Sequence, residues 1–360
     1  MQLLYSVLCI ALLPLFGMAA VEDTKPDRSK SIEKNFNLDS DGLLEISNSF
    51  GDVCITTWNK TSVYLKITVE VTGGSDESIT KRLRDVEVRF SAAPSKVSAR
   101  TNITNIDENN SMWNWIKGND RTNLKVHYEV FMPVTANLDV RNDYGTITLD
   151  KLRGSLKLRC DFGRIAIGQL LDNNNNLQFD YTKNSHIDYM RAGTVKADFS
   201  TMKIYGSERI NLSGDYSTFT FETLKELEFN TDFSTVAVEK AVNVIGRGDY
   251  STFKLGSVTK NADLNTTFGS INIAKMEAGF NSIQVRTQYT KVDIGYDASA
   301  AFDFIARVEY ASIKMSNNLQ ITRSESDSEQ KLKAGYNLKA NSGSSMELRS
   351  EFGTITLREQ

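Results

Sequence analysis

Apolar and polar residues alternate with a period of two along most of the chain from about residue 32 onward. This is the period of β-strands that bury one face and expose the other. No repeated segment shows apolar residues three and four positions apart over enough length to form a helical repeat. The alternation therefore predicts an all-β fold.

A four-residue motif recurs in the second part of the sequence: Asp, then Tyr or Phe, then Gly or Ser, then Thr. Its aromatic residues lie 17 to 21 positions apart, except for a last gap of 42, which we interpret as two units, one of them degenerate. The clear Asp–aromatic pairs are Asp143 and Tyr144, Asp161 and Phe162, Asp198 and Phe199, Asp215 and Tyr216, Asp232 and Phe233, and Asp249 and Tyr250. Looser copies begin at Tyr181, Phe268, Tyr289, Tyr310 and Phe352, and an isolated early copy begins at Phe50.

Aligning the copies on the aromatic residue gives a common register. Small or apolar residues stand two, four and six positions before it, as Cys160, Leu158 and Leu156 do. Apolar residues stand three and five positions after it, as Ile147 and Leu149 do. A unit of about 18 residues cannot form its own core, so it must stack on its neighbours. The register predicts a right-handed parallel β-helix with about 17–21 residues per coil, a bend at the Gly or Ser, and aromatic rings stacked inside the wall.

Tyr and Phe alternate strictly from Tyr144 through Tyr289. Duplication of a two-unit block explains this with one coil per unit. A coil of about 35 residues, with separate Tyr and Phe columns at opposite corners, is the alternative.

The sequence predicts four segments. Residues 1–20 are expected to be a signal peptide, because residues 3–16 are almost wholly apolar and small residues follow them. Residues 21–31 are expected to be a flexible leader. Residues 32–135 are expected to form a β region with one short helix after Ser75, which caps the open end of the solenoid. Residues 136–360 are expected to be the solenoid repeats.

Composition narrows the classes of function. The net charge is −3 with acidic and basic residues interspersed, which argues against nucleic acid as a partner. Only two histidines occur, so zinc chemistry and a histidine base are disfavoured, and no metal or cofactor is expected. The register places Cys160 inward and Cys54 outward, which predicts that they do not form a disulfide.

Three stretches resemble a family of bacterial envelope proteins named "putative adhesin", a domain of unknown function. They are residues 48–53 with Thr57 to Lys60, residues 128–133, and residues 142–147. The resemblance implies a parallel β-helix, export to the periplasm or cell surface, and an adhesive or scaffolding role. No segment after residue 20 is long and apolar enough to span a membrane, so no transmembrane segment is expected in the mature chain. It carries no catalytic residues.

Each candidate for chemistry has a structural explanation beside it. The aspartates of the repeat form a column whose carboxylates accept hydrogen bonds from the N–H groups of the following turn, or, as the alternative, bind calcium. The Ser-Thr pairs, such as Ser217 and Thr218, form a hydroxyl ladder that is solvated or binds glycan or ordered water. His186 lies in an irregular unit with charged neighbours, either a bulge or a lyase-like group.

Trp113 and Trp115 lie in a polar stretch, where they either contact a ligand or pack on the neighbouring sheet. Three functions remain open. The first is a non-enzymatic, adhesin-like envelope protein that binds a glycan or another envelope protein. The second is a protein that binds or degrades polysaccharide. The third is a self-assembling filament.

Overall fold

The computed structural model describes residues 28–104 and 122–360, and 71% of the chain is strand and 3% helix. The all-β solenoid is confirmed. The chain divides into two compact units, residues 1–170 and 171–360. The signal peptide expected at 1–20, and Trp113 and Trp115, lie outside the described residues.

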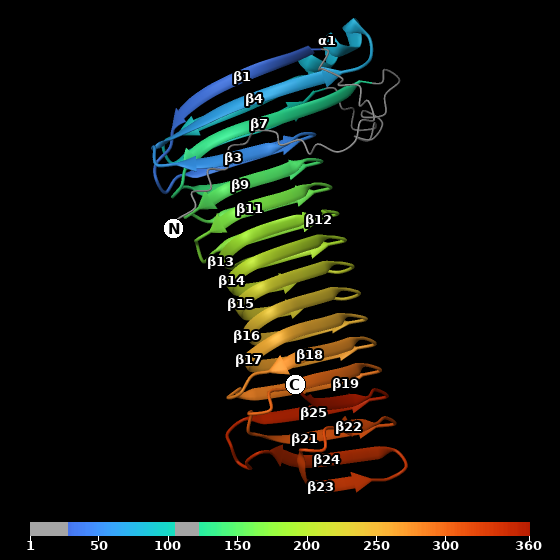
Figure 1. Ribbon diagram of the computed structural model, residues 1–360. Helices are drawn as coiled ribbons and strands as arrows, with labels where there is room; N and C mark the ends of the chain where they lie inside the picture. Colours follow the sequence, from blue (N-terminus) through green and yellow to red (C-terminus); the bar gives the residue numbers. More distant parts are fainter. Residues whose placement is uncertain (1–27, 105–121) are drawn as a thin grey trace, which may run out of the picture. The chain divides into compact units, whose positions relative to one another are not determined.

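Unit 1 contains two sheets (Figure 1). The first runs in the order β1 (Arg28–Asn37), β4 (Ser62–Thr72), β7 (Asn123–Pro133), β3 (Val53–Trp58), β9 (Thr146–Leu152) and β11 (Arg164–Leu170). The second runs in the order β5 (Val86–Ala93), β6 (Lys96–Ile103), β2 (Leu43–Ser49), β8 (Asn137–Asp143) and β10 (Leu156–Asp161). The antiparallel strands lie at one end of each sheet and the parallel strands follow.

The predicted helix is α1 (Asp76–Asp85), and Ser75 caps it by accepting a hydrogen bond from the Ser78 N–H group. Its last turn is held by Lys30, whose ammonium group donates to the carbonyls of Leu83 and Val86. The expected leader 21–31 needs a correction at its end: residues 28–31 belong to β1 and pair with β4, because the apolar residues further along β1 require this register.

Unit 2 begins with β12 (Asn175–Asp180), followed by five long strands that each run through both sheets of the coil. They are β13 (Ser185–Asp198), β14 (Thr201–Ser213), β15 (Thr218–Asn230), β16 (Thr235–Asp249) and β17 (Thr252–Thr267). Thr201 pairs with Thr218 and Thr218 with Thr235, so each coil contains 17 residues here. This excludes the 35-residue coil.

The end of unit 2 departs from sequence order. The remaining strands are β18 (Ser270–Met276), β19 (Ser282–Gln288), β20 (Lys291–Tyr296), β21 (Phe302–Glu309), β22 (Ile313–Met315), β23 (Gln320–Ser326), β24 (Gln330–Asn337), β25 (Ser345–Glu351) and β26 (Ile355–Glu359). β25 pairs in parallel with β19 on one side and with β21 on the other. The last coil of the chain is thus inserted between two earlier ones.

The 42-residue gap is therefore not two units with one degenerate. It contains the antiparallel hairpin β23–β24, which extends the sheet beyond β21. The polar segment 316–330, which the sequence predicts as a surface loop, contributes β23. Every residue of β23 is exposed, and Arg323 and Glu325 place charged side chains on this edge strand, which disfavours pairing with other chains.

The predicted inward positions are buried as expected. Leu156, Leu158 and Cys160 before the aromatic residue are at most 1% exposed, and Ile147 and Leu149 after it at most 3%. Cys54 pairs with Thr148, and Cys54 and Cys160 are not disulfide-bonded. Burial raises the pKa of the Cys160 thiol to about 12, so this sulfur packs as an apolar group.

Candidate functional site

The aromatic residues of the repeat stack on one another, but they lie on the outside of the coil. Each one occupies the turn with a left-handed backbone; φ is 51° at Phe233 and 53° at Tyr216. The expectation that the rings lie inside the wall is wrong. The left-handed backbone directs the side chain outward. The bend begins at the aromatic residue and, in the copies that carry Gly, includes the Gly, as at Phe162 and Gly163.

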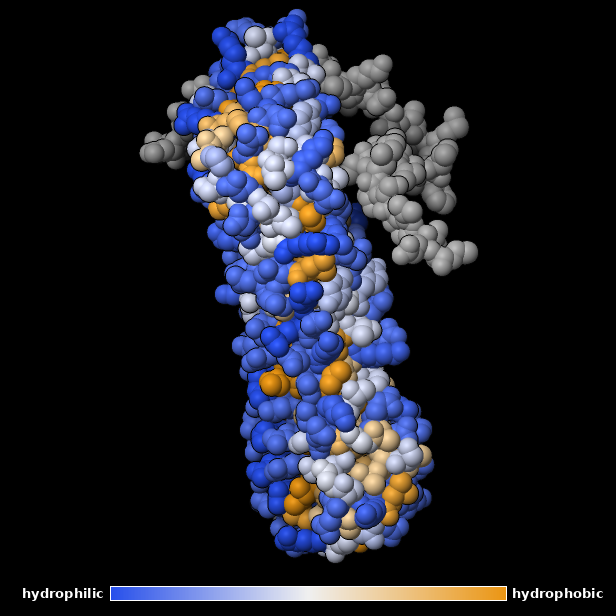
Figure 2. All heavy atoms as spheres, turned by 90° about the vertical axis from the view of Figure 1, so that its left-hand side faces the viewer, coloured by the Kyte–Doolittle hydropathy of each residue, from blue (hydrophilic) through white to orange (hydrophobic). Residues whose placement is uncertain are grey.

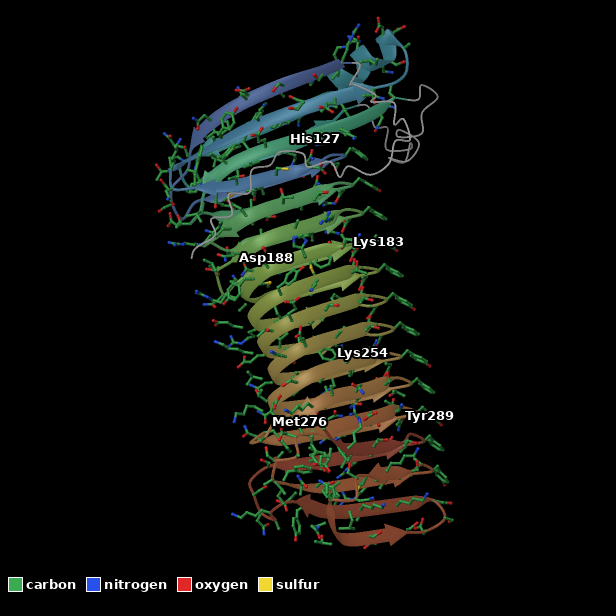
Figure 3. The ribbon with its side chains drawn as sticks, in the orientation of Figure 1. His127, Lys183, Asp188, Lys254, Met276 and Tyr289 are labelled. Atoms are coloured by element: carbon green, nitrogen blue, oxygen red, sulfur yellow. The ribbon has the colours of Figure 1, made fainter. Side chains whose placement is uncertain are left out.

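In unit 2 nine rings form a column that we call the aromatic ridge. Neighbouring ring centroids are 4.7–5.1 Å apart and the ring planes are within 10° of parallel. Each residue is 46–54% exposed. In spatial order the ridge is Tyr181, Phe199, Tyr216, Phe233, Tyr250, Phe268, Tyr289, Phe352 and Tyr310. Figure 3 shows Tyr289 at the turn end of the coils, away from the buried Met276.

The ridge is large for an exposed apolar surface. The nine residues, each about half exposed with roughly 200 Å² of surface, present on the order of 900 Å², which includes the hydroxyl groups of five tyrosines. The largest apolar patch on a typical monomer is about 300–600 Å². Figure 2 shows the side that lies to the left in Figure 1, where hydrophobic residues are scattered among hydrophilic ones. A contiguous patch of this size is typical of an interaction site.

An acidic row borders the ridge. Asp198, Asp215, Asp232 and Asp249 come directly before ridge residues, and none of the four forms an ion pair with any residue that the structure describes. The Asp215 carboxylate accepts a hydrogen bond of 2.9 Å from the Asp232 N–H group, and the other coils repeat this contact. The donor belongs to the next coil, not to the following turn as the sequence predicts.

The expected hydroxyl ladder is half buried: the threonines Thr201 and Thr218 are exposed, whereas the serines that precede them are buried, contrary to the expectation of a solvated ladder. Ser217 and Ser234 are each 4% exposed. The Ser217 N–H group donates to Ser234 Oγ at 3.0 Å, and Ser234 Oγ donates to the Asp232 carbonyl at 2.8 Å. These hydroxyls join coils internally and are not available to a glycan or to ice-like water.

A second feature of unit 2 is a groove of about 780 Å³ between the sheet and the β23–β24 hairpin, which we call the hairpin groove. Arg286 of β19, Arg349 of β25 and Arg307 of β21 are register partners across it. A parallel row closer to the ridge consists of Gln288, Glu351 and Glu309.

The structure does not assemble the lyase-like group that His186 suggests. No hydrogen bond or ion pair joins His186 to Lys183, Asp188 or Arg191 within the described ranges. Lys183 precedes β13 and Asp188 lies within it, and Figure 3 shows Lys183 near the turn end of the coils and Asp188 on the opposite side. Among residues 28–104 and 122–360, no group of three or more His, Cys, Asp or Glu side chains is placed to hold a metal ion.

No family model and no curated protein sequence matches the chain. Solved structures are similar to it at low identity. A "putative cell adhesion protein" from Clostridium sporogenes is 10% identical, with 92% of this chain and 100% of that one covered and a TM-score of 0.18. A "putative adhesin" from Parabacteroides distasonis is 12% identical, with 74% and 97% covered and a TM-score of 0.36. A "putative lipid binding protein" from the same species is 11% identical, with 92% and 96% covered and a TM-score of 0.27.

Two of these three structures are named for adhesion and one for lipid binding. In the described part of the chain, no helix has the length and apolar character needed to cross a membrane.

Proposed function

We propose that the protein is a non-enzymatic, exported protein of the cell envelope that adheres to or scaffolds another envelope protein. The aromatic ridge is the observation that carries this proposal. It is a rigid apolar edge held by stacked rings, and its area exceeds what a monomer usually leaves exposed.

The geometry of the ridge favours a protein partner over a sugar. Sugars stack on the faces of aromatic rings, but here each interior ring has both faces covered by its neighbours. Only ring edges and tyrosine hydroxyl groups remain accessible. The acidic row beside the ridge adds a requirement for positive charge. A protein surface with an apolar groove and a basic rim would complement both the apolar ring edges and the acidic row.

The test uses two variants of the full chain, each expressed in the cells that produce the protein. One carries a photo-crosslinking amino acid in place of Phe233 in the ridge, and the other carries it in place of the exposed Tyr205 outside the ridge. The protein captured only from Phe233 is then purified. Its affinity is measured for the wild type and for the variant Phe199→Asn, Phe233→Asn, Phe268→Asn, since Asn tolerates the left-handed backbone. The control variant carries Tyr205→Asn and Ile245→Asn, at exposed apolar residues elsewhere.

We expect the ridge variant to bind at least about tenfold more weakly, because loss of a few apolar contacts at an interface exceeds 1.4 kcal/mol. The control variant should bind like the wild type. Equal affinity of the ridge variant and the wild type would rule out the ridge as the binding surface.

A further inference from the structure

The hairpin groove has the chemistry of a ligand site that is separate from the ridge. Its arginines come from three neighbouring strands, so their guanidinium groups repeat at the inter-strand spacing of roughly 4.8 Å. The row of Gln288, Glu351 and Glu309 lies two residues further along the same strands. A row of donors thus runs beside a row of acceptors across three coils.

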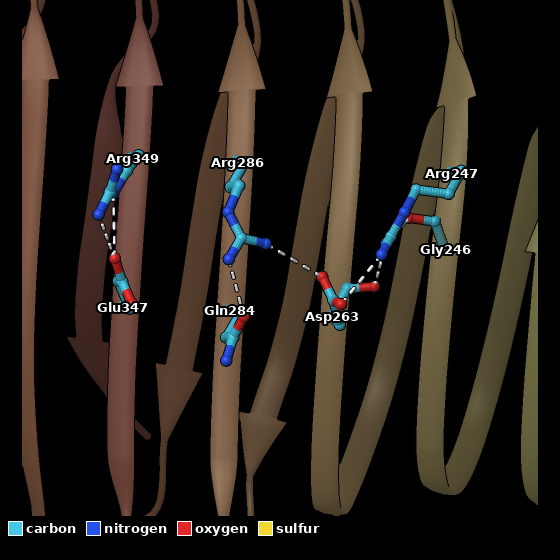
Figure 4. A network of polar contacts seen from close by, with 7 residues as sticks. All are labelled: Gly246, Arg247, Asp263, Gln284, Arg286, Glu347 and Arg349. Carbon is cyan, nitrogen blue, oxygen red and sulfur yellow. Dashed lines mark hydrogen bonds and ion pairs between the residues drawn. The ribbon is translucent and has the colours of Figure 1, made fainter.

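The arginines retain most of their hydrogen-bonding capacity. Arg349 donates from Nε and Nη2 to one oxygen of Glu347, at 3.0 and 2.7 Å. Arg286 donates to Gln284 Oε1 at 2.9 Å and forms an ion pair of 3.5 Å with Asp263 (Figure 4). Arg307 makes only an ion contact of 4.0 Å with Glu347, and no described residue accepts a hydrogen bond from it. Because a guanidinium group carries five N–H donors, most donors in the row remain unused.

The acceptor row is similarly open. Glu351 accepts one hydrogen bond from Gln288, and Glu309 accepts one from Gln330, both at 2.9 Å. A carboxylate has about four lone-pair sites. Each glutamate therefore keeps acceptor capacity that faces the groove.

The balance of charge decides the class of ligand. Four basic and four acidic side chains line the groove, so it has no net attraction for a polyanion or a polycation. A hydroxyl group both donates and accepts, and a chain of hydroxyl groups satisfies a donor row and an acceptor row together. We propose that the hairpin groove binds a neutral, hydroxyl-rich oligosaccharide that lies across β19, β25 and β21.

Titration calorimetry of the purified full chain tests this proposal with three neutral probes, cellohexaose, maltohexaose and chitohexaose, and one anionic probe, hexagalacturonate. The groove variants are Arg307→Gln, which changes the row of arginine donors, and Glu351→Gln, which changes the row of acceptors. The matched control is Arg209→Gln, an exposed arginine on the same sheet that pairs with Glu226 outside the groove. The urea midpoint of each variant confirms that it is folded.

We expect at least one neutral hexasaccharide to bind, and each groove variant to bind it about tenfold or more weakly, the usual effect of losing a hydrogen bond to a charged group. Arg209→Gln should not change the affinity for the hexasaccharide, and neither should the triple ridge variant. The ridge variant thus distinguishes this proposal from the proposed binding of a protein partner to the aromatic ridge. Three outcomes would overturn it: no neutral probe binds, hexagalacturonate binds more tightly than all of them, or the groove variants keep wild-type affinity.

Discussion

The aromatic turn makes a quantitative prediction about Phe233, because its ring and its backbone have opposite effects on stability. The ring stacks on Tyr216 and Tyr250, with centroids 4.9 and 4.7 Å away. Two stacked pairs contribute about 1–3 kcal/mol, and burying half of the ring, roughly 100 Å², contributes about 2.5 kcal/mol. The backbone opposes this, since a left-handed residue other than glycine costs about 1–2 kcal/mol.

Two substitutions separate these terms. Phe233→Ala removes the ring and keeps the unfavourable backbone, so we expect it to lower the free energy of unfolding by about 3.5–5.5 kcal/mol. Phe233→Gly removes the ring and also the steric cost at φ 51°. We therefore expect the glycine variant to be more stable than the alanine variant by at least about 0.5 kcal/mol.

Urea unfolding followed by circular dichroism gives both differences, and equal slopes indicate that the variants unfold over the same surface. In an ordinary strand the order would be reversed, because glycine there is less stable than alanine. An alanine variant as stable as the glycine variant, or more so, would refute the role of the left-handed turn. Two variants with wild-type stability would refute the contribution of the stack.

Four further predictions follow from other parts of the chain. Burial raises the pKa of the Asp143 carboxyl group, so its ionisation lowers the stability of the folded state once the pH exceeds the pKa of the unfolded state, about 3.8. Asp143→Asn should therefore be more stable than the wild type at pH 7. This difference in the free energy of unfolding should disappear as the pH falls through the raised pKa toward about 3.8. Ser234→Ala leaves the buried Ser217 N–H group without its acceptor, and calorimetric or urea unfolding should show a loss of about 1–3 kcal/mol. Cys160 should resist iodoacetamide at pH 8 in the folded protein and react after denaturation, and labelling in the folded state would contradict its burial. Mass spectrometry of exported protein should find an N-terminus after Ala20, the expected cleavage site, and an uncleaved chain in the cytoplasm would contradict export.

The strands and their inward residues could be predicted from the sequence because a period of two leaves few alternatives. Leu158 and Ile147 are buried because each is in phase with its own strand. The outward direction of the rings could not be predicted in this way. Tyr and Phe rarely adopt a left-handed backbone, so a pattern of large apolar residues is more often a sign of burial.

The hairpin groove was missed because it depends on the order of strands in space. Arg349 lies 42 residues beyond Arg307 in the sequence, and it becomes the neighbour of both Arg286 and Arg307 because β25 inserts between β19 and β21. One signal was present, since an arginine stands three positions before the aromatic residue in each of the last three copies. Equal offsets in stacked coils give side chains on one row, so this repetition predicts an arginine row even when strand order is unknown.

The order of the last coils also bears on why Tyr and Phe alternate. In the sequence the alternation ends, because Tyr310 follows Tyr289. In space it continues, because Phe352 stacks between them at 4.7 Å from Tyr289 and 5.1 Å from Tyr310. Duplication of a two-unit block produces alternation along the chain and does not account for this position. Tyr and Phe therefore alternate in the spatial order of the stacked rings. This alternation keeps the tyrosine hydroxyl groups two coils, or roughly 10 Å, apart. A partner that docks on the ridge then meets an apolar edge with one polar group on every second coil.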